Sequence, residues 1–248
     1  MNTADYIDYL VTWLEEQRQN LYQMDAYVLG LSGGIDSAVC AHLLAKTGQS
    51  VYTYLLPSAV NDPTDLTDAQ AVLARTGLSG DVISIQPMYD AVMSVVGDSL
   101  NPNPERQNVL KGNLMARLRM VTLFTIAQSH RAIVVGTDNA AESYTGYFTK
   151  FGDGAADVLP LAKLRKEQVY QLGEALGVPE AILQKAPSAG LWQGQTDEDE
   201  MGVSYAELDA FLRGESVSPA AQERIDFWHN RSHHKRMLPP EPDKLLDE

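Results

Sequence analysis

The sequence predicts one α/β domain over residues 1–248, a doubly wound, mainly parallel sheet of about five strands with helices on both faces. Three observations lead to this prediction. Short apolar runs typical of buried strands alternate with segments in which apolar residues recur at helical spacing. A glycine-rich turn at residues 29–37 joins the first apolar run to a helix. No internal repeat, low-complexity tract or linker divides the 248 residues.

The first half of the chain is predicted to alternate helix and strand, which requires right-handed crossovers between parallel strands. Gly48 and Gly77 are helix stop signals, and Pro57 ends a strand because it lacks a backbone N–H. The predicted elements are, in order, a helix at 5–24, a strand at 26–28, a helix at 38–46, a strand at 51–56, a helix at 68–75, a strand at 82–85, helices at 88–98 and 105–130, and a strand at 132–137. Since parallel sheets bind ligands beyond the carboxyl ends of their strands, the glycine-rich turn lies at the predicted binding edge.

The glycine-rich turn has the composition of a phosphate-binding loop. A helix that starts after such a turn presents unpaired N–H groups and the positive end of its dipole to an anion. Gly33 and Gly34 allow phosphate oxygens to approach the backbone, and Ser32 and Ser37 add hydroxyl donors. Asp36 would repel phosphate alone, so it fits a site that also binds a divalent metal. The alternative is an ordinary tight turn in which this carboxylate is a surface charge.

The charge balance narrows the class of partners. Lys and Arg number 19 against 33 Asp and Glu, and the net charge of −14 argues against nonspecific binding to nucleic acid or to an anionic membrane. A nucleotide that enters so acidic a protein needs local cations or a metal. The N-terminus lacks the basic and then apolar layout of a secretory signal, and no apolar run is long enough to span a bilayer. We therefore expect a cytoplasmic protein.

Positive charges interrupt the apolar pattern of the helix predicted at residues 105–130. Gly112 and Asn113 also weaken this helix, by up to ~1 kcal/mol each relative to alanine, so close approach of a ligand or of another backbone would explain them. Arg117 and Arg119 fit either a ligand contact or a solvated helix face.

Polar groups follow the strand at 132–137, where this fold binds its ligands. Glu142 could share a metal with Asp36, and Lys150 could neutralise phosphate. The glycines around Asp153 would let a loop fold close to a ligand, or they belong to a long surface turn.

Lys163, Arg165 and Lys166 fall in the first turn of a helix predicted at residues 163–176. Cations at a helix N-terminus oppose the helix dipole, and each charge destabilises the helix by up to ~1 kcal/mol unless an anion neutralises it. A bound phosphate would neutralise these charges.

The rest of the second half is predicted to be loop and helix. The acidic stretch 193–200 fits a mobile lid or a solvated loop, and helices are predicted at 205–212 and 219–227. His233 and His234 do not form a metal pair, because adjacent side chains on a helix point apart.

The turn from Ser32 to Ser37 resembles the SGGxDS loop of the N-type ATP pyrophosphatases, which split ATP into AMP and pyrophosphate. It lacks the Walker lysine and the GxGxxG spacing of dinucleotide-binding proteins. Six stretches, in the family's order, together resemble NAD synthetase, and they lie at residues 32–37, 112–120, 135–142, 149–157, 186–191 and 234–236.

The resemblance implies a Rossmann-like fold of the adenine nucleotide alpha hydrolase type and a homodimer with the dinucleotide site near the interface. It implies Mg²⁺ held by Asp36 and Glu142, and catalytic roles for Asp36, Lys166 and Asp153. The implied ATP contacts are Gly30, Leu31, Ser32, Gly33, Gly34, Ile35, Asp36, Ser37, Thr137, Lys166 and Ser188. The implied dinucleotide contacts are Arg117, Lys150, Asp157, His234 and Lys235. Two departures from the family are Ser188 in place of threonine and Gly190 in place of aspartate.

The implied reaction is ATP-dependent amidation of nicotinic acid adenine dinucleotide (deamido-NAD) to NAD through an acyl-adenylate, with release of AMP and pyrophosphate. Ammonia is the expected nitrogen donor, because the usual glutamine-hydrolysing domains need a reactive cysteine. Cys40 is the only cysteine, and it is expected to be buried in the helix behind the phosphate loop. The rival hypotheses are an ATP pyrophosphatase with a nucleobase or tRNA base as acceptor, and a nonenzymatic nucleotide sensor.

Overall fold

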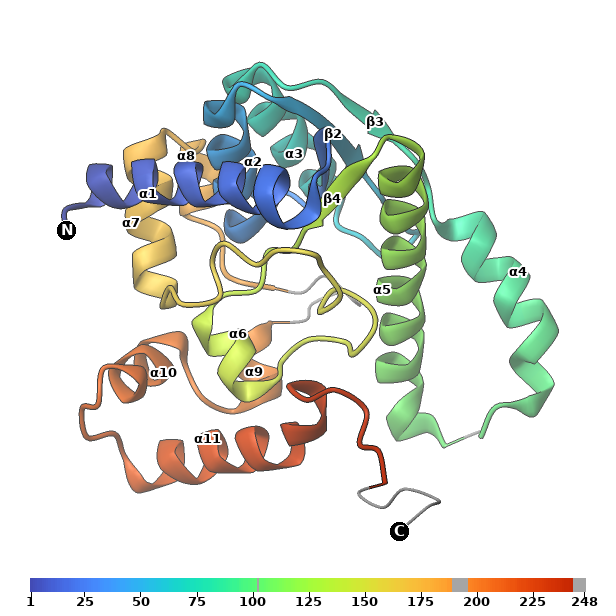
Figure 1. The fold of residues 1–248 in the computed structure, drawn as a ribbon. Helices are drawn as coiled ribbons and strands as arrows, with labels where there is room; N and C mark the ends of the chain where they lie inside the picture. Colours follow the sequence, from blue (N-terminus) through green and yellow to red (C-terminus); the bar gives the residue numbers. More distant parts are fainter. Residues whose placement is uncertain (102, 189–195, 243–248) are drawn as a thin grey trace, which may run out of the picture.

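The computed structural model describes residues 1–101, 103–188 and 196–242. Figure 1 shows a central sheet between two layers of helices, with a group of C-terminal helices beneath it. The strands are β1 (Ala26–Gly30), β2 (Ser50–Leu55), β3 (Gly80–Val82) and β4 (Ala132–Val135). The α-helices are α1 (Thr3–Glu16), α2 (Ile35–Thr47), α3 (Pro63–Thr76), α4 (Gln86–Val96), α5 (Pro104–Ser129), α6 (Ala140–Thr145), α7 (Lys166–Leu176), α8 (Glu180–Leu183), α9 (Asp197–Met201), α10 (Tyr205–Leu212) and α11 (Pro219–Arg231). A π-helix (Gln17–Tyr22) continues α1, and short 3₁₀ turns cover Gly97–Ser99 and His233–Lys235.

The sheet has the order β3-β2-β1-β4, and every pairing is parallel. Val28 of β1 lies between Tyr52 of β2 and Val134 of β4. The predicted doubly wound α/β fold is confirmed, but the predicted number of about five strands is wrong, since the described residues form four. Beyond β4 only a single bridge joins Val135 to Val158, because the glycine-rich segment that follows is held in turns and does not extend the sheet.

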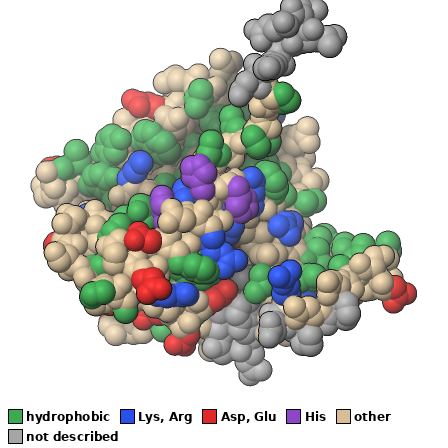
Figure 2. All heavy atoms as spheres, turned by 90° about the horizontal axis from the view of Figure 1, so that it is seen from below, with side chains coloured by type: hydrophobic (Ala, Val, Ile, Leu, Met, Phe, Trp, Pro, Cys, Tyr) green, Lys and Arg blue, Asp and Glu red, His purple; other side chains and the backbone are tan. Residues whose placement is uncertain are grey.

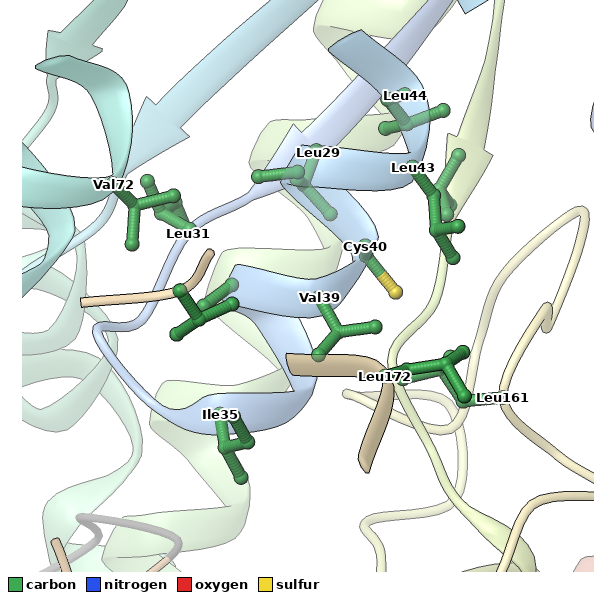
Figure 3. Close-up of a cluster of buried hydrophobic side chains, with 14 of the residues drawn as sticks. Leu29, Leu31, Ile35, Val39, Cys40, Leu43, Leu44, Val72, Leu161 and Leu172 are labelled. Atoms are coloured by element: carbon green, nitrogen blue, oxygen red, sulfur yellow. The ribbon is translucent and has the colours of Figure 1, made fainter. Parts of the chain in front are cut away.

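Two apolar layers cover the two faces of the sheet. On one face, α1, α2, α3 and α7 pack against the β1 side chains Tyr27 and Leu29. On the other face, α5 covers Val28 and its neighbours, and α4 lies outside α5 (Figure 1). Figure 3 shows the first layer around α2, where the Cys40 side chain lies within the apolar cluster. This burial of Cys40 confirms the prediction.

The connections between strands and helices place the ligand-binding site beyond the carboxyl ends of β1 and β4. β1 leads to α2 on one face, whereas its neighbour β4 follows α5 from the other face. Such a change of direction leaves a crevice beyond the carboxyl ends of the two strands. A third apolar cluster, formed by α6, α9, α10 and α11, closes this end of the molecule. No helix in the described ranges is long and apolar enough to cross a membrane.

Candidate active site

The phosphate loop is closed by its own hydroxyl groups. Ser37 Oγ accepts the N–H of Ser32 at 3.2 Å and donates to the carbonyl of Gly34 at 3.0 Å. The N–H of Gly34 donates to Ser32 Oγ at 3.2 Å. Gly33 has a φ of +85°, and a Cβ there would come within 2.4 Å of the carbonyl oxygen of Asp65. Glycine is therefore required at this position, and the loop presents the N-terminus of α2 to the crevice.

Asp36, Glu142 and Lys166 form a cluster beside the phosphate loop. Asp36 is in the first turn of α2, Glu142 in α6 and Lys166 at the start of α7. Lys166 Nζ lies 2.6 Å from Asp36 Oδ2 and 3.7 Å from Glu142 Oε1. Asn139 joins the two acidic residues, since its amide nitrogen donates to Asp36 Oδ1 at 3.1 Å and its backbone N–H donates to Glu142 Oε2 at 3.0 Å.

Burial and charge shift the pKa values of this cluster. Burial, with a contribution from Asp36, raises the pKa of Glu142 to about 8. Burial alone would lower the pKa of Lys166, but the carboxylates of Asp36 and Glu142 raise it above its ordinary value. Burial also raises the pKa values of Asp138 and Asp153. The Lys166 ammonium thus keeps its positive charge. A further cation would stabilise the charged form of the carboxyl groups beside it.

The donor set fits Mg²⁺. Asp36 and Glu142 offer carboxylate oxygens from two elements to the same side of the phosphate loop. Among the residues that the structure describes, no group of three or more His, Cys, Asp or Glu side chains is arranged to hold a metal. A site of two carboxylates suits Mg²⁺, which commonly takes one or two carboxylates and completes its shell with substrate phosphates and water.

A cavity of about 1380 Å³ opens at the carboxyl ends of β1 and β4 and extends toward the C-terminal helices. It brings most of the predicted site residues together. Those on its wall are Gly30, Leu31, Ser32, Gly34, Ile35, Asp36, Ser37, Thr137, Glu142, Asp153, Lys166, Ser188, His234 and Lys235. Figure 2 shows Lys, Arg and His side chains gathered near the middle of the molecule's lower face. An acidic protein therefore has a local region of positive charge near the cavity.

The predicted site residues that do not line this cavity are Gly33, Arg117, Lys150 and Asp157. Arg117 is exposed and donates to the carbonyl of Lys150 at 3.4 Å. Lys150 lines a smaller adjacent hollow of about 260 Å³. The Asp157 carboxylate accepts the N–H of Val134 at 2.7 Å. The roles of Arg117, Lys150 and Asp157 in dinucleotide binding stay predictions.

Lys235 and Asp153 lie on the cavity wall with partners from the protein. Lys235 Nζ donates to the carbonyls of Gly146 and Phe148, and so joins the C-terminal segment to the chain that follows α6. Asp153 Oδ1 accepts the N–H of Thr149 at 3.0 Å. Both side chains are thereby oriented on the cavity wall.

Two predictions near the site need correction or fall outside the structure. Helix α7 begins at Lys166 and not at Lys163, so Lys163 and Arg165 precede the helix. The N-terminal N–H groups of α7 bind the Asp209 carboxylate, which lies 43 positions from Lys166 in the chain. The first part of the predicted lid, 193–195, and Gly190 lie outside the described residues, and the later part forms α9.

Sequence reasoning missed two contributors to the site, Asn139 and Tyr205, and left a third, Arg119, open between a ligand contact and a solvated helix face. Arg119 faces the cavity, where Nε donates to the carbonyl of Leu56 and Nη2 to Asn61 Oδ1, both at 3.0 Å. Asn139 was not singled out within its stretch, although an N-cap residue three positions before a glutamate is the recognisable signal of a capping box. Tyr205 donates from a distant helix, and no local pattern in the sequence marks it.

The fold and the site define a class, namely doubly wound α/β proteins in which a glycine-rich loop at a helix start lies beside an acidic pair and a lysine. Comparison with known proteins narrows the class. The family model described as NAD synthase matches residues 6–239. The chain is 68% identical over 242 residues to an NH₃-dependent NAD⁺ synthetase of Mannheimia succiniciproducens, with 98% of this chain and 97% of the relative covered. The chain belongs to the NAD synthase family, which confirms the family predicted from the six stretches.

Solved structures agree with this membership. An NMN synthetase from Francisella tularensis superposes with a TM-score of 0.94 at 53% identity, over 98% of this chain and 100% of the other. An NH₃-dependent NAD synthetase from Campylobacter jejuni superposes with a TM-score of 0.80 at 27% identity, again over 98% and 100%.

Proposed function

We propose that this chain catalyses the ATP-dependent amidation of deamido-NAD to NAD, with ammonia as the nitrogen donor. The observation that carries the proposal is the cluster of Asp36, Lys166 and Glu142 beside the phosphate loop. Family membership and the names of the relatives, which are NH₃-dependent NAD⁺ synthetases, support the acceptor and the donor. The protein is accordingly a ligase that forms a C–N bond, and its proposed location is the cytoplasm.

The acceptor carboxylate must be activated, because its charge repels nucleophiles and its oxygen is a poor leaving group. In the proposed first step a carboxylate oxygen attacks the α-phosphorus of ATP. The bond between the α-phosphorus and the oxygen that bridges it to the β-phosphorus breaks. The products are an acyl-adenylate and pyrophosphate. Lys166 takes up charge on the leaving pyrophosphate, and the N–H groups at the start of α2 hold its oxygens. Magnesium held by Asp36 and Glu142 would supply further neutralisation of phosphate charge.

In the proposed second step ammonia attacks the acyl carbon. The bond between that carbon and the AMP oxygen breaks, AMP leaves, and the nitrogen loses its surplus proton to give a neutral amide. The protein acts by positioning and electrostatics and needs no covalent nucleophile. Cys40 is 0% exposed and burial raises its pKa, so its thiol is unsuited to hydrolysing glutamine. This supports free ammonia as the donor.

A second candidate acceptor is nicotinic acid mononucleotide, which the same chemistry would convert to NMN. The observation that favours it is the TM-score of 0.94 and 53% identity to the structure described as an NMN synthetase. The two acceptors share the nicotinate carboxylate and differ by one adenylyl group. Both therefore use the same phosphate loop, acidic pair and lysine.

One assay distinguishes these possibilities. The purified chain is supplied with Mg²⁺, ATP and ammonium, and kcat/KM is measured for deamido-NAD and for nicotinic acid mononucleotide, with AMP and pyrophosphate quantified in parallel. NAD formed one-to-one with AMP is the expected result. A higher kcat/KM with the mononucleotide would assign the second candidate. ATP binding without either amide would favour the nucleotide sensor, and robust activity with glutamine in place of ammonium would overturn the donor.

We further propose a homodimer. Helix α4 has no buried residue, and the exposed side chains of α4 and α5 include Val95, Val109 and Val121. Apolar side chains exposed in this way fit a protein interface. Sedimentation should give twice the 27.2 kDa mass of the chain, whereas a monomer at micromolar concentration would contradict the assignment.

A further inference from the structure

Helix α10 contacts the backbone of Lys166. The buried carboxylate of Asp209 accepts the N–H of Lys166 at 3.0 Å and the N–H of Glu167 at 2.8 Å. N–H groups at a helix start have no partner within their own helix, and a negative charge there is favourable to the helix dipole. Through this contact, α10 determines where the backbone of Lys166 lies.

Tyr205, the first residue of α10, contacts the other end of the lysine. Lys166 Nζ lies 4.7 Å from the centroid of the tyrosine ring. The hydroxyl oxygen is 3.2 Å from Glu142 Oε1 and 3.0 Å from Asp197 Oδ2. The other oxygen of Glu142 accepts the N–H of Asn139. Each oxygen of the proposed metal-binding carboxylate therefore has a partner on a different element.

These contacts restrict the two functional side chains of the cluster. The hydroxyl of Tyr205 lies between two carboxyl groups, so rotation of Glu142 would break a hydrogen bond that its own helix cannot replace. The face of the ring attracts the ammonium of Lys166 and keeps it close to Asp36, at 2.6 Å. Without such partners, a carboxylate and a lysine on a cavity wall would sample several rotamers, and their orientation toward ATP would be lost.

We propose that Tyr205 is a positioning residue of the ligase reaction. Its hydroxyl holds the Glu142 carboxylate toward the metal position shared with Asp36, and its ring holds the Lys166 ammonium beside both acids. The inference rests on the proposed function. If Tyr205 served only as a packing residue of the cluster of α6, α9, α10 and α11, the ring would be needed but the hydroxyl would not.

The substitution Tyr205→Phe separates these possibilities, because it removes one oxygen atom and keeps the ring. Mg²⁺ is titrated calorimetrically into the full chain saturated with α,β-methylene ATP, which cannot be cleaved at the reacting bond. The affinity for Mg²⁺ is expected to fall by about 10- to 100-fold, as is usual when the partner of a metal ligand is lost. The value of kcat should fall by a similar factor, while KM for the acceptor stays within about twofold.

The matched control is Tyr27→Phe. Tyr27 is fully buried, and its hydroxyl donates to a carboxylate, Glu15 Oε1, at 2.8 Å, but it lies in the core and not in the cavity. This variant should lower the melting temperature without changing Mg²⁺ affinity. The proposal is overturned if Tyr205→Phe binds Mg²⁺ as the wild type does, if both variants lose affinity equally, or if only KM for the acceptor changes. Failure of the wild type to form an amide would reject the proposed function, whereas the Mg²⁺ titration tests Tyr205 separately.

Discussion

Asp36 joins the phosphate loop to remote parts of the chain, whereas the serine hydroxyls of the loop bind within the loop itself. Its two oxygens bind Lys166 and Asn139, which come from segments more than 100 positions away. The sequence predicted its role in metal binding from its place in the loop, but the lysine partner follows only from the fold. The same carboxylate thus serves both the ammonium of Lys166 and the proposed metal.

We expect Asp36→Asn to abolish amide formation while the chain remains folded. The variant keeps one side-chain oxygen but loses the charge that the metal and Lys166 require. Loss of one partner from a buried ion pair should lower the free energy of unfolding by about 3 kcal/mol. Product formation and circular dichroism melting curves measure the two effects. A near-normal rate would contradict the metal assignment.

Lys235 differs from Lys166 on the cavity wall because its ammonium binds two backbone carbonyls, whereas that of Lys166 binds a carboxylate. We expect Lys235→Ala to raise KM for deamido-NAD more than KM for ATP, since the resemblance assigns this side chain to the dinucleotide and it also orients Gly146 and Phe148 on the cavity wall. Steady-state kinetics with each substrate varied in turn would measure this. A larger rise in KM for ATP would show that the assigned partner is wrong.

At the scale of elements, the loop between β2 and α3 is held by α5. Asn61 Oδ1 accepts from Ser58 and from Arg119, and Arg119 also binds the carbonyl of Leu56. Much of this loop lines the cavity beside the phosphate loop. From the sequence alone, Arg119 fitted either a contact with a ligand or a position on a solvated helix face. The structure separates it from Arg117, because two positions on a helix turn the side chain by more than half a circle.

We expect Arg119→Met to raise KM for ATP by about 10-fold. The variant keeps an apolar stem but loses two hydrogen bonds, each contributing roughly 0.5–1.5 kcal/mol to the position of the loop. Lys111→Met is the control, since this lysine is exposed on the same helix. An unchanged KM, or an equal rise in the control, would argue that the loop does not contribute to ATP binding.

Element boundaries were predicted well where the signal is local and poorly where the partner is remote. Gly48 and Gly77 end α2 and α3 in left-handed conformations, as predicted. The start of α7 was placed three residues early, because the sequence does not show that Asp209 binds its first N–H groups. The strand predicted at 82–85 was misplaced, since the edge strand β3 covers Gly80–Val82 and overlaps the prediction only at the exposed Val82.

At the scale of the whole molecule, the cavity is built by segments from the entire chain. The order of strands and helices and the place of two motifs, at 32–37 and 135–142, followed from the sequence, because these motifs lie at the carboxyl ends of predicted strands. The C-terminal helices were predicted only as helices. Their contributions, Tyr205 and Asp209, arise from packing over many positions of sequence and have no local signal.

His42 should make the stability of the protein pH-dependent. It is buried in α2, and burial lowers its pKa below its ordinary value of 6.5, with Arg75 acting in the same direction. The unfolded chain therefore binds the proton more readily, so the contribution of His42 is complete above about pH 6.5 and is lost as the pH falls toward the folded pKa. Urea unfolding at about pH 7.5 and 5.5 should show a smaller decrease for His42→Gln than for the wild type. Equal decreases would contradict this assignment.

Because Cys40 is buried, the rate at which its thiol reacts reports how often the surrounding structure opens. Its thiol lies inside α2, on the helix whose N-terminus faces the phosphate site, and the sequence contains no other cysteine to compete for a thiol reagent. Labelling must wait until this helix separates from the sheet, so the labelling rate measures that opening. Saturating ATP and Mg²⁺ should slow the labelling in proportion to their affinity for the folded state. Ligand binding can thus be ranked by mass spectrometry on the unmodified chain, without a turnover assay.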